Sequence, residues 1–366
     1  MKSFRLFLIF FMMTVPVFLS AQETAAPASS APVPENAPAT EASAPEAAAP
    51  AETPPASSAT ATPAPKAKVR PIRFIFYSGI RYVLLYDVAD YYRLAATFTT
   101  KGVTLYSKTR RIEMSYTHRE GSINGVKTYF LAPVLYLDKK PYITESDFLK
   151  VIDPVFRTKL YRKHPLRTIM IDPGHGGSDP GAPGPVLSEK QINLIIGLKL
   201  KKALERLGFK VIMTRSGDTF PSLSARSSLC KLRKPDLYIS IHCNSAGNRT
   251  VKGVETYLMT PTGCASTADK TARNQSYPGN AFDSNNERLA YEIQKALVKY
   301  TTGADRGVRH ARFAVLRGAT CPAVLVECGF LSNLSEGRKL ATNDYQNRIV
   351  AGILTGIARY SRAVQK

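Results

Sequence analysis

Three short apolar segments of this chain each lead directly into a side chain that can bind a metal ion or carry a proton. The segments and the residues that follow them are 167–171 before the glycine-rich loop that carries His175, 236–241 before His242, and 323–326 before Glu327. Short apolar runs bounded by turn residues are typical of buried strands. Because ligands gather outside the carboxyl ends of strands in open α/β sheets, we expect these side chains to share one edge of a sheet.

A helix is predicted between the first two of these segments, over residues 189–207. Ser188 is a good N-cap, and Gln191 completes a capping box with it. Apolar residues then recur with the helical period, and Gly208 ends the pattern. Glu189 lies in the first turn, where the helix dipole favours a carboxylate. It is therefore either a helix-start residue with no further role or a partner for the two histidines.

Two histidines and a glutamate from separate segments form a ligand set that suits zinc. His175, Glu189 and His242 would make a three-ligand shell with an open position for water. Such nitrogen and oxygen ligands suit zinc better than calcium or magnesium. Zinc lowers the pKa of water from about 15.7 to near 7, and Glu327 could pass a proton from that water to a leaving nitrogen. The plainer alternative for Glu327 is an ion pair with one of the many arginines.

These motifs resemble those of the zinc-dependent N-acetylmuramoyl-L-alanine amidases, in the same order and spacing over about 167–360. The matching segments are 172–177, Glu189, 213–215 with 222–226, 240–244 and 327–333. The resemblance implies an α/β catalytic domain over 161–366, with a mixed, mostly parallel sheet and helices on both faces. It also implies Zn2+ on His175, Glu189 and His242, with Glu327 as the catalytic carboxylate. The implied reaction cleaves the peptidoglycan amide between N-acetylmuramic acid and L-alanine of the stem peptide.

Other residues near these motifs are candidates for substrate contacts. They are Asn244 after the second strand, Glu255 in an alternating strand pattern, and Arg215. Glu255 could instead face solvent or form a pair, and Arg215 could brace a loop. The polar stretch 260–287 is either a tolerated surface insertion, a rim for the glycan strand, or a cover over the zinc that uses Glu287.

The N-terminal residues have the features of an export signal. Lys2 and Arg5 precede an apolar run of 14 residues, 6–19, which small residues follow. This pattern predicts a secretory signal peptide over residues 1–21. The run is shorter than the roughly 20 residues of a spanning helix, so we expect no stable membrane insertion. An uncleaved anchor is the alternative, and the expected location is the periplasm or cell envelope, or outside the cell.

A tether and a small module follow the signal. Residues 22–70 are almost entirely Ala, Pro, Thr, Ser and Glu, which predicts a disordered linker. Residues 71–160 predict an α+β module. Its expected strands are 103–106, 112–116 and 127–131, with a turn at 122–125, and its expected helices are 87–94 and 146–152. The module weakly resembles copper-amine-oxidase N-terminal-like modules, but His118 stands alone, so we expect a binding or spacing role without metal.

The net charge indicates a polyanionic partner. The chain has 50 Lys and Arg against 28 Asp and Glu, a formal net charge of +22. Such a balance favours nucleic acid, an acidic membrane surface or an anionic cell wall. Because export opposes a nucleic-acid partner, peptidoglycan is the expected one.

Several functional alternatives stay open on the sequence alone. A zinc peptidase acting on wall cross-links would use the same residues, and an inert wall-binding protein would keep the site without turnover. A thiol nucleophile at Cys243 beside His242 is a further option. An amidase would serve wall remodelling or daughter-cell separation, and a protein activator is compatible with that role.

Overall fold

The computed structural model describes residues 71–157, 165–269 and 271–365. The predicted signal peptide and linker lie outside these residues. Within the described ranges, no helix combines the length and apolar character that crossing a membrane requires.

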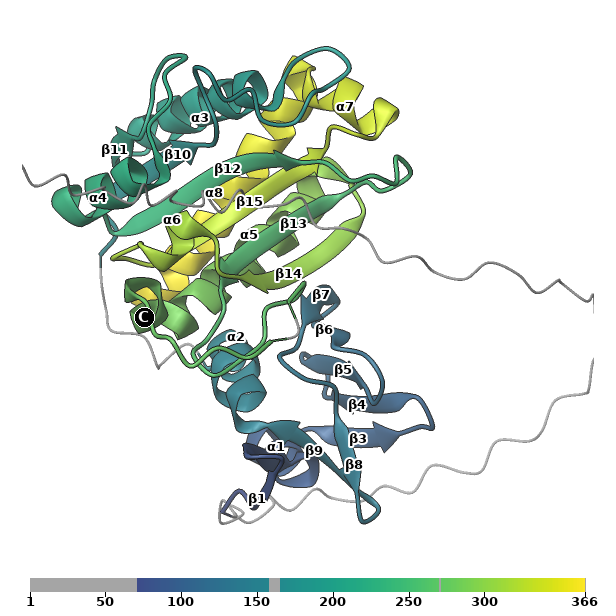
Figure 1. The fold of residues 1–366 in the computed structure, drawn as a ribbon. Coiled ribbons are helices and arrows are strands. Elements are labelled where there is room, and N and C mark those ends of the chain that lie inside the picture. The colour runs from purple at the N-terminus through teal and green to yellow at the C-terminus, as the bar shows by residue number, and fades with distance from the viewer. Residues whose placement is uncertain (1–70, 158–164, 270, 366) are drawn as a thin grey trace, which may run out of the picture.

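An eleven-stranded mixed sheet runs through most of the described chain (Figure 1). Its strand order is β11-β10-β12-β15-β13-β14-β7-β6-β5-β4-β3. The C-terminal half of the chain supplies β10 (Thr168–Pro173), β11 (Lys210–Met213), β12 (Leu237–Asn244), β13 (Val254–Met259), β14 (Asp305–Ala311) and β15 (Ala323–Phe330). The N-terminal module supplies β3 (Ala95–Phe98), β4 (Gly102–Tyr106), β5 (Arg111–Ser115), β6 (Glu120–Ile123) and β7 (Val126–Tyr129).

Strand direction decides which side chains reach the edge that carries the candidate site. Strands β10, β12 and β15 are parallel, so their carboxyl ends lie at one edge of the sheet. Strand β13 runs antiparallel to β15, and β14 runs parallel to β13. The beginnings of β13 and β14 therefore lie at the same edge as the ends of β12 and β15.

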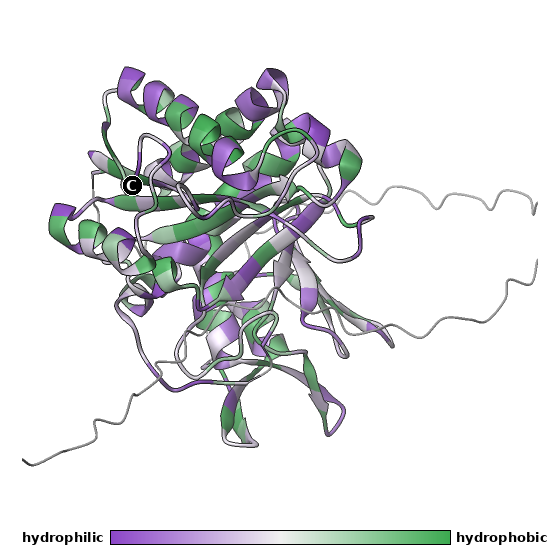
Figure 2. Ribbon diagram, turned by 45° about the horizontal axis from the view of Figure 1, so that its top comes forward, coloured by the Kyte–Doolittle hydropathy of each residue, from purple (hydrophilic) through white to green (hydrophobic). Residues whose placement is uncertain are grey.

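Helices cover both faces of the C-terminal strands β10 to β15, as expected. One face packs against α3 (Glu189–Arg206), α5 (Asp283–Thr301) and α8 (Asn343–Gln365), and the other against α4 (Leu223–Arg233) and α6 (Ala314–Arg317). Ile169 and Ile171 of β10 face the first group, while Met170 faces the second. This alternation follows from the two-residue repeat of a strand. The central strands are largely apolar between these helices (Figure 2).

The remaining elements lie around this sheet. A four-stranded sheet contains β1 (Phe74–Tyr77), β2 (Ile80–Leu84), β9 (Lys140–Thr144) and β8 (Leu135–Leu137), in that order. The short helices are α1 (Leu85–Tyr92), η1 (Asp147–Ile152), α2 (Asp153–Phe156), η3 (Pro278–Phe282) and α7 (Leu334–Leu340).

The strands and helices predicted in the module were confirmed, whereas the long-range pairing of its sheet was not predicted. The predicted strands correspond to β4, β5 and β7, and the predicted helices to α1 and the η1–α2 segment. The turn is narrower than predicted, because Ser122 and Ile123 belong to β6. Asn124 and Gly125 alone make the turn, both with positive φ, which is typical of a two-residue hairpin.

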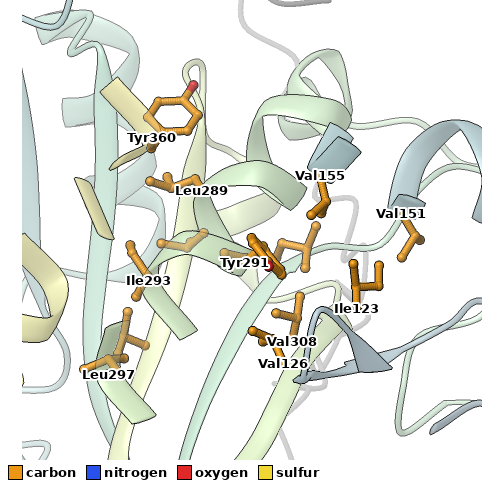
Figure 3. Packing of buried hydrophobic residues seen from close by; sticks show 14 of the residues in the cluster. Ile123, Val126, Val151, Val155, Leu289, Tyr291, Ile293, Leu297, Val308 and Tyr360 are labelled. Atoms are coloured by element: carbon orange, nitrogen blue, oxygen red, sulfur yellow. The ribbon is translucent and has the colours of Figure 1, made fainter. Parts of the chain in front are cut away.

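The module and the catalytic strands share one sheet and one core. Thr128 of β7 pairs in parallel with Val308 of β14. Figure 3 shows Ile123 and Val126 of the module packed near Val155, Tyr291 and other residues of the same buried cluster. The sequence predicted a module over 71–160 and a catalytic domain over 161–366, and it contained no local signal for this junction.

We predict that Ile123→Ala destabilises the whole chain. Ile123 is fully buried in the shared core, so its truncation should lower the free energy of unfolding by about 2–5 kcal/mol. Urea denaturation measures the loss. Lys108→Ala, in the exposed β4–β5 turn, is the control and should change that free energy by less than about 0.5 kcal/mol. Equal effects of the two changes would contradict the shared core.

Candidate metal centre

The loop after β10 holds His175 in an unusual backbone conformation. His175 has φ +59°, in the left-handed region that costs energy for a residue with a Cβ. Gly174 precedes it where only glycine fits, since a Cβ there would lie 2.2 Å from Cε1 of His242. The loop therefore brings the backbone of one candidate ligand against the ring of another.

Two buried arginines hold this loop in place. Arg226 donates from Nη1 to the backbone oxygen of Pro173 at 3.0 Å and from Nη2 to that of His175 at 2.9 Å. Arg215 donates from Nε to Pro173 at 2.8 Å and from Nη2 to Gly174 at 2.9 Å. Each arginine is only 3% exposed. These buried hydrogen bonds to the loop carbonyls hold His175 in its strained backbone conformation.

Arg215 was predicted as a substrate contact, and the structure favours its alternative role as a loop brace. Its guanidinium makes further bonds to the backbone oxygens of Lys190 and Gly217. Four of its hydrogen-bond donations thus go to backbone carbonyls. We therefore do not carry Arg215 forward as a substrate contact.

Asp172 anchors the arginine braces to the sheet. Its buried carboxylate accepts hydrogen bonds from Arg226, from Oγ1 of Thr214 at 2.6 Å and from Oγ of Ser240 at 2.9 Å. Burial alone would raise the pKa of Asp172, but the charge of Arg226 and these hydrogen bonds outweigh it and lower that pKa. The carboxylate is therefore charged and paired rather than free for chemistry.

His175, Glu189 and His242 converge at one point. Oε1 of Glu189 lies 3.0 Å from Nε2 of His175 and 3.0 Å from Nδ1 of His242. The candidate ligand atoms of the three residues all lie within 4.8 Å of one another. The two imidazole rings are perpendicular, with centroids 5.0 Å apart. The predicted trio is thus assembled from a loop, a helix start and a strand end.

The electrostatics of the trio favour a bound cation. Burial would raise the pKa of Glu189, but its hydrogen bonds with both histidines dominate and hold that pKa well below its ordinary value. Burial opposes protonation of His175, while its contacts with Glu189 and Asp179 raise its pKa above the ordinary value. The charged carboxylate of Glu189 therefore makes the electrostatic potential negative at the point where it meets the two histidine rings.

A second group of residues orients these ligands, and the sequence did not single them out. Oδ2 of Asp179 lies 2.7 Å from Nδ1 of His175, the ring nitrogen that faces away from Glu189. The backbone N–H of Ala182 donates to Oε2 of Glu189 at 2.9 Å, and that of Cys243 donates to Oε1 at 3.2 Å. The sequence signal for this role of Asp179 was its position, because it is an acidic residue four positions after His175.

The geometry fits a small divalent ion. Ligand atoms bound tetrahedrally to zinc at about 2.0–2.2 Å are roughly 3.3 Å apart, close to the observed 3.0 Å contacts. Two imidazole nitrogens and one carboxylate oxygen are also the donor types that zinc accepts. The residues present therefore fit the metal that the resemblance implied.

Glu327 lies beside the trio on the neighbouring strand. It is the register partner of His242, and its side chain is 9% exposed. Among the described residues, its Oε2 has no hydrogen-bond partner. Burial raises the pKa of Glu327 well above the ordinary value, and the charges of Glu189 and Glu255 add to the rise. Glu327 is thus a buried carboxylic acid on the strand beside His242, and among the described residues no arginine forms an ion pair with it.

Glu255 and Asn244 form a neighbouring polar group. Oε2 of Glu255 accepts from Nδ2 of Asn244 at 3.2 Å and from the Tyr257 hydroxyl at 2.8 Å. Its Oε1 pairs with Arg306 and Arg309. Because Glu255 is 1% exposed and fully paired, the structure favours its paired alternative. Asn244 lies at the end of β12 beside it and stays a prediction as a substrate contact.

The polar stretch 260–287 does not bring Glu287 to the metal point. Glu287 lies in α5, fully buried, with Oε2 3.4 Å from Nε2 of His310. Helix α5 covers the face of the sheet that Thr256 and Val308 point to, whereas Glu255 and Glu327 point to the other. A cover over the metal that uses Glu287 is therefore not supported.

Comparisons with known proteins point to one family. A family model described as N-acetylmuramoyl-L-alanine amidase matches residues 169–359. The protein YqiI of Bacillus subtilis (strain 168), described as uncharacterised, is 36% identical over 194 residues, or 53% of this chain and 84% of its own length. The N-acetylmuramoyl-L-alanine amidase LytC of the same organism is 35% identical over 213 residues, or 57% of this chain and 39% of LytC.

One solved structure is similar to about half of this chain. It is the catalytic domain of CwlV, an N-acetylmuramoyl-L-alanine amidase from Bacillus (Paenibacillus) polymyxa var. colistinus. It is 34% identical, with a TM-score of 0.45, and covers 53% of this chain and 98% of that domain. The family match begins at residue 169 and does not include the N-terminal module.

We predict that Arg226→Met destabilises the fold strongly. The change leaves the buried carboxylate of Asp172 without its cation, which should lower the free energy of unfolding by about 3–5 kcal/mol. Urea denaturation of the full chain measures it. Arg233→Met, on the exposed end of the same helix, is the matched control. A stability unchanged by Arg226→Met would show that the loop does not need this brace.

Proposed function

Because this chain belongs to the N-acetylmuramoyl-L-alanine amidase family, we propose that it cleaves peptidoglycan between N-acetylmuramic acid and L-alanine with zinc held by His175, Glu189 and His242. The observation that carries the zinc assignment is the convergence of these three ligands at one sheet edge, beside an unpaired Glu327. When bound, zinc acts as a Lewis acid that polarises a carbonyl and makes water acidic near neutral pH.

The residues of this chain then divide the remaining work. Asp179 accepts the Nδ1–H of His175, so that Nε2 presents a lone pair toward Glu189 and His242. Such an outer carboxylate fixes the tautomer and the ring orientation of a ligand histidine. Arg215 and Arg226 hold the loop that presents this ring.

Glu327 is the proposed proton carrier. It takes a proton from the attacking water at Oε2 while the new C–O bond forms, and delivers it to the nitrogen as the C–N bond breaks. Its Oε2 has no competing partner among the described residues, so it is free for both transfers. A buried carboxyl whose pKa is raised holds the proton long enough to protonate a leaving nitrogen.

The wall substrate also indicates where the protein acts. Peptidoglycan lies outside the cytoplasm, so we propose that the chain is exported by residues 1–21 and tethered by residues 22–70, before the module 71–160 and the catalytic domain 161–366. The formal charge of +22 would favour retention on an anionic wall. A protein activator is compatible with this placement.

We predict that Glu327→Gln abolishes most turnover but keeps the metal. Loss of the proton carrier should lower kcat on purified sacculi by about 10²–10⁴-fold, because the metal ligands are untouched. Product analysis and elemental analysis of the same preparation measure both. Glu205→Gln, exposed on α3, is the control.

The products also separate the amidase from the peptidase alternative. An amidase releases intact stem peptides and leaves peptide-free glycan, whereas a cross-link peptidase leaves shortened stems on the glycan. Shortened stems as the main product, or full activity of Glu327→Gln, would contradict the proposal.

We predict that Asp179→Asn weakens zinc binding by about 10–100-fold. The amide cannot supply the negative charge that orients the His175 ring. Titration of the metal-stripped full chain with Zn2+ and a competing chelator measures the affinity without any substrate. Asp344→Asn, exposed on α8, should leave the affinity unchanged, and an equal affinity for Asp179→Asn would exclude the orienting role.

A further inference from the structure

One face of the large sheet continues from the proposed metal site onto the N-terminal module. Glu327 of β15 is the register partner of Glu255 of β13. Tyr257, two residues along the same face, pairs with Arg309 of β14. Arg309 in turn donates from Nη2 to the hydroxyl of Tyr129 in β7 at 2.9 Å. The strands follow one another in this order in Figure 1, so a row of polar side chains on one face of the sheet crosses the junction between the two parts.

A cleft of about 1020 Å³ lies on the module end of this surface. Its walls include Glu113, Glu120, Ser122, Lys127 and Tyr129 of the module and Thr267 of the catalytic part. Their register places Glu120 opposite Tyr129, and Ser122 opposite both Lys127 and Glu113. These side chains therefore belong to one face of the sheet, the face that also carries Glu327.

The segment after β13 forms one rim of the cleft. Arg119 of the module donates from Nη1 and Nη2 to the backbone oxygens of Ser266 and Ala265, at 2.8 and 3.0 Å. Ala265 and Thr267 line the cleft. The stretch 260–287 is thus tied to the module, and the cleft is built by both parts of the chain rather than left between them.

The charged side chains that line the cleft include acids as well as cations, and most of them are held by partners within the chain. Nζ of Lys127 lies 2.6 Å from Oε1 of Glu120, whose Oε2 accepts from the Tyr129 hydroxyl at 2.8 Å. Ser122 donates from Oγ to Glu113 at 2.8 Å. Cations that are already paired offer little to a polyanion, whereas fixed donors and acceptors beside an aromatic ring suit a neutral, hydroxyl-rich and amide-rich ligand.

The distance between the cleft and Glu327 limits which part of the substrate the cleft can bind. Glu120 is four strands away from Glu327, through β13, β14, β7 and β6, which is roughly 19 Å at about 4.8 Å per strand. The reacting amide cannot occupy both places. A ligand that is part of the substrate must therefore be a distant portion of a long polymer.

We propose that this cleft binds the uncharged glycan chain of peptidoglycan beyond the sugar that carries the cleaved amide. The inference rests on the proposed function for the identity of the polymer. It assigns the N-terminal module a direct part in substrate binding, with the junction of β7 and β14 aligning the glycan along the sheet toward Glu327. Stem peptides carry carboxylates, for which the paired cations of the cleft are poorly suited.

Binding of an uncharged glycan analogue tests the proposal. The full chain with Glu327→Gln, which removes turnover, is incubated with a soluble oligomer of N-acetylglucosamine, which carries the hydroxyl and acetamide groups of the glycan but no carboxylate, and its affinity is measured. Ser122→Trp in this background fills the cleft with an indole and should weaken binding by about tenfold or more. Lys108→Trp, in the exposed β4–β5 turn of the same module, is the matched control and should bind like the parent.

A second variant with a smaller change keeps the test valid if Ser122→Trp does not fold. Tyr129→Phe keeps the ring but removes the hydroxyl that connects Glu120 and Arg309, so it should also weaken glycan binding. Thermal melting of every variant verifies that it is folded.

The outcomes separate this inference from the amidase proposal. Parent-like glycan affinity of folded Ser122→Trp and Tyr129→Phe would overturn the cleft assignment. Cleft-dependent binding of intact sacculi without binding of the uncharged N-acetylglucosamine oligomer would replace the glycan with the stem peptide as the occupant. The two proposals can also fail separately. If the wild-type chain does not digest sacculi, the proposed amidase activity is wrong. Glycan binding that depends on the cleft would still support the cleft assignment in that case.

Discussion

The strained loop at His175 is the constraint on which the rest of the site depends. His175 has a positive φ, which costs energy. It keeps this conformation only if contacts with its surroundings stabilise it by more than that cost. Here two buried guanidinium groups bind successive carbonyls of the loop, and Asp172 balances one of them. Gly174 lets the loop approach the His242 ring. The three ligands can meet because buried hydrogen bonds hold this short segment in place.

The mixed direction of the sheet explains why acids and histidines share one edge. Two parallel strands deliver His242 and Glu327 at their ends, while the antiparallel β13 delivers Glu255 near its beginning. Glu255 forms ion pairs with Arg306 and Arg309, so its carboxylate is not free for chemistry. Its charge still raises the pKa of Glu327. The same register carries the polar face across β14 onto the module.

The sequence predicted those parts of the molecule whose signals are local. The capping box at Ser188 and Gln191 correctly placed the start of α3 and hence Glu189. Apolar runs correctly placed β12 and β15, although both strands continue past the predicted ends, to Asn244 and Phe330. The pairing of Thr128 with Val308 could not be predicted, because the two residues are far apart in sequence and parallel register leaves no local pattern. The partner of His175 was missed because Asp179 acts through the irregular path of a loop.

The reversal of β13 relative to β15 has a consequence for how such a chain can change over time. Since β13 begins at the metal edge, it ends at the opposite edge, and the stretch that follows leaves the sheet there. Insertions or deletions in that stretch would not displace the ligands. Evolution can therefore lengthen or reshape it to accommodate different accessory modules while the hydrolytic centre is inherited intact.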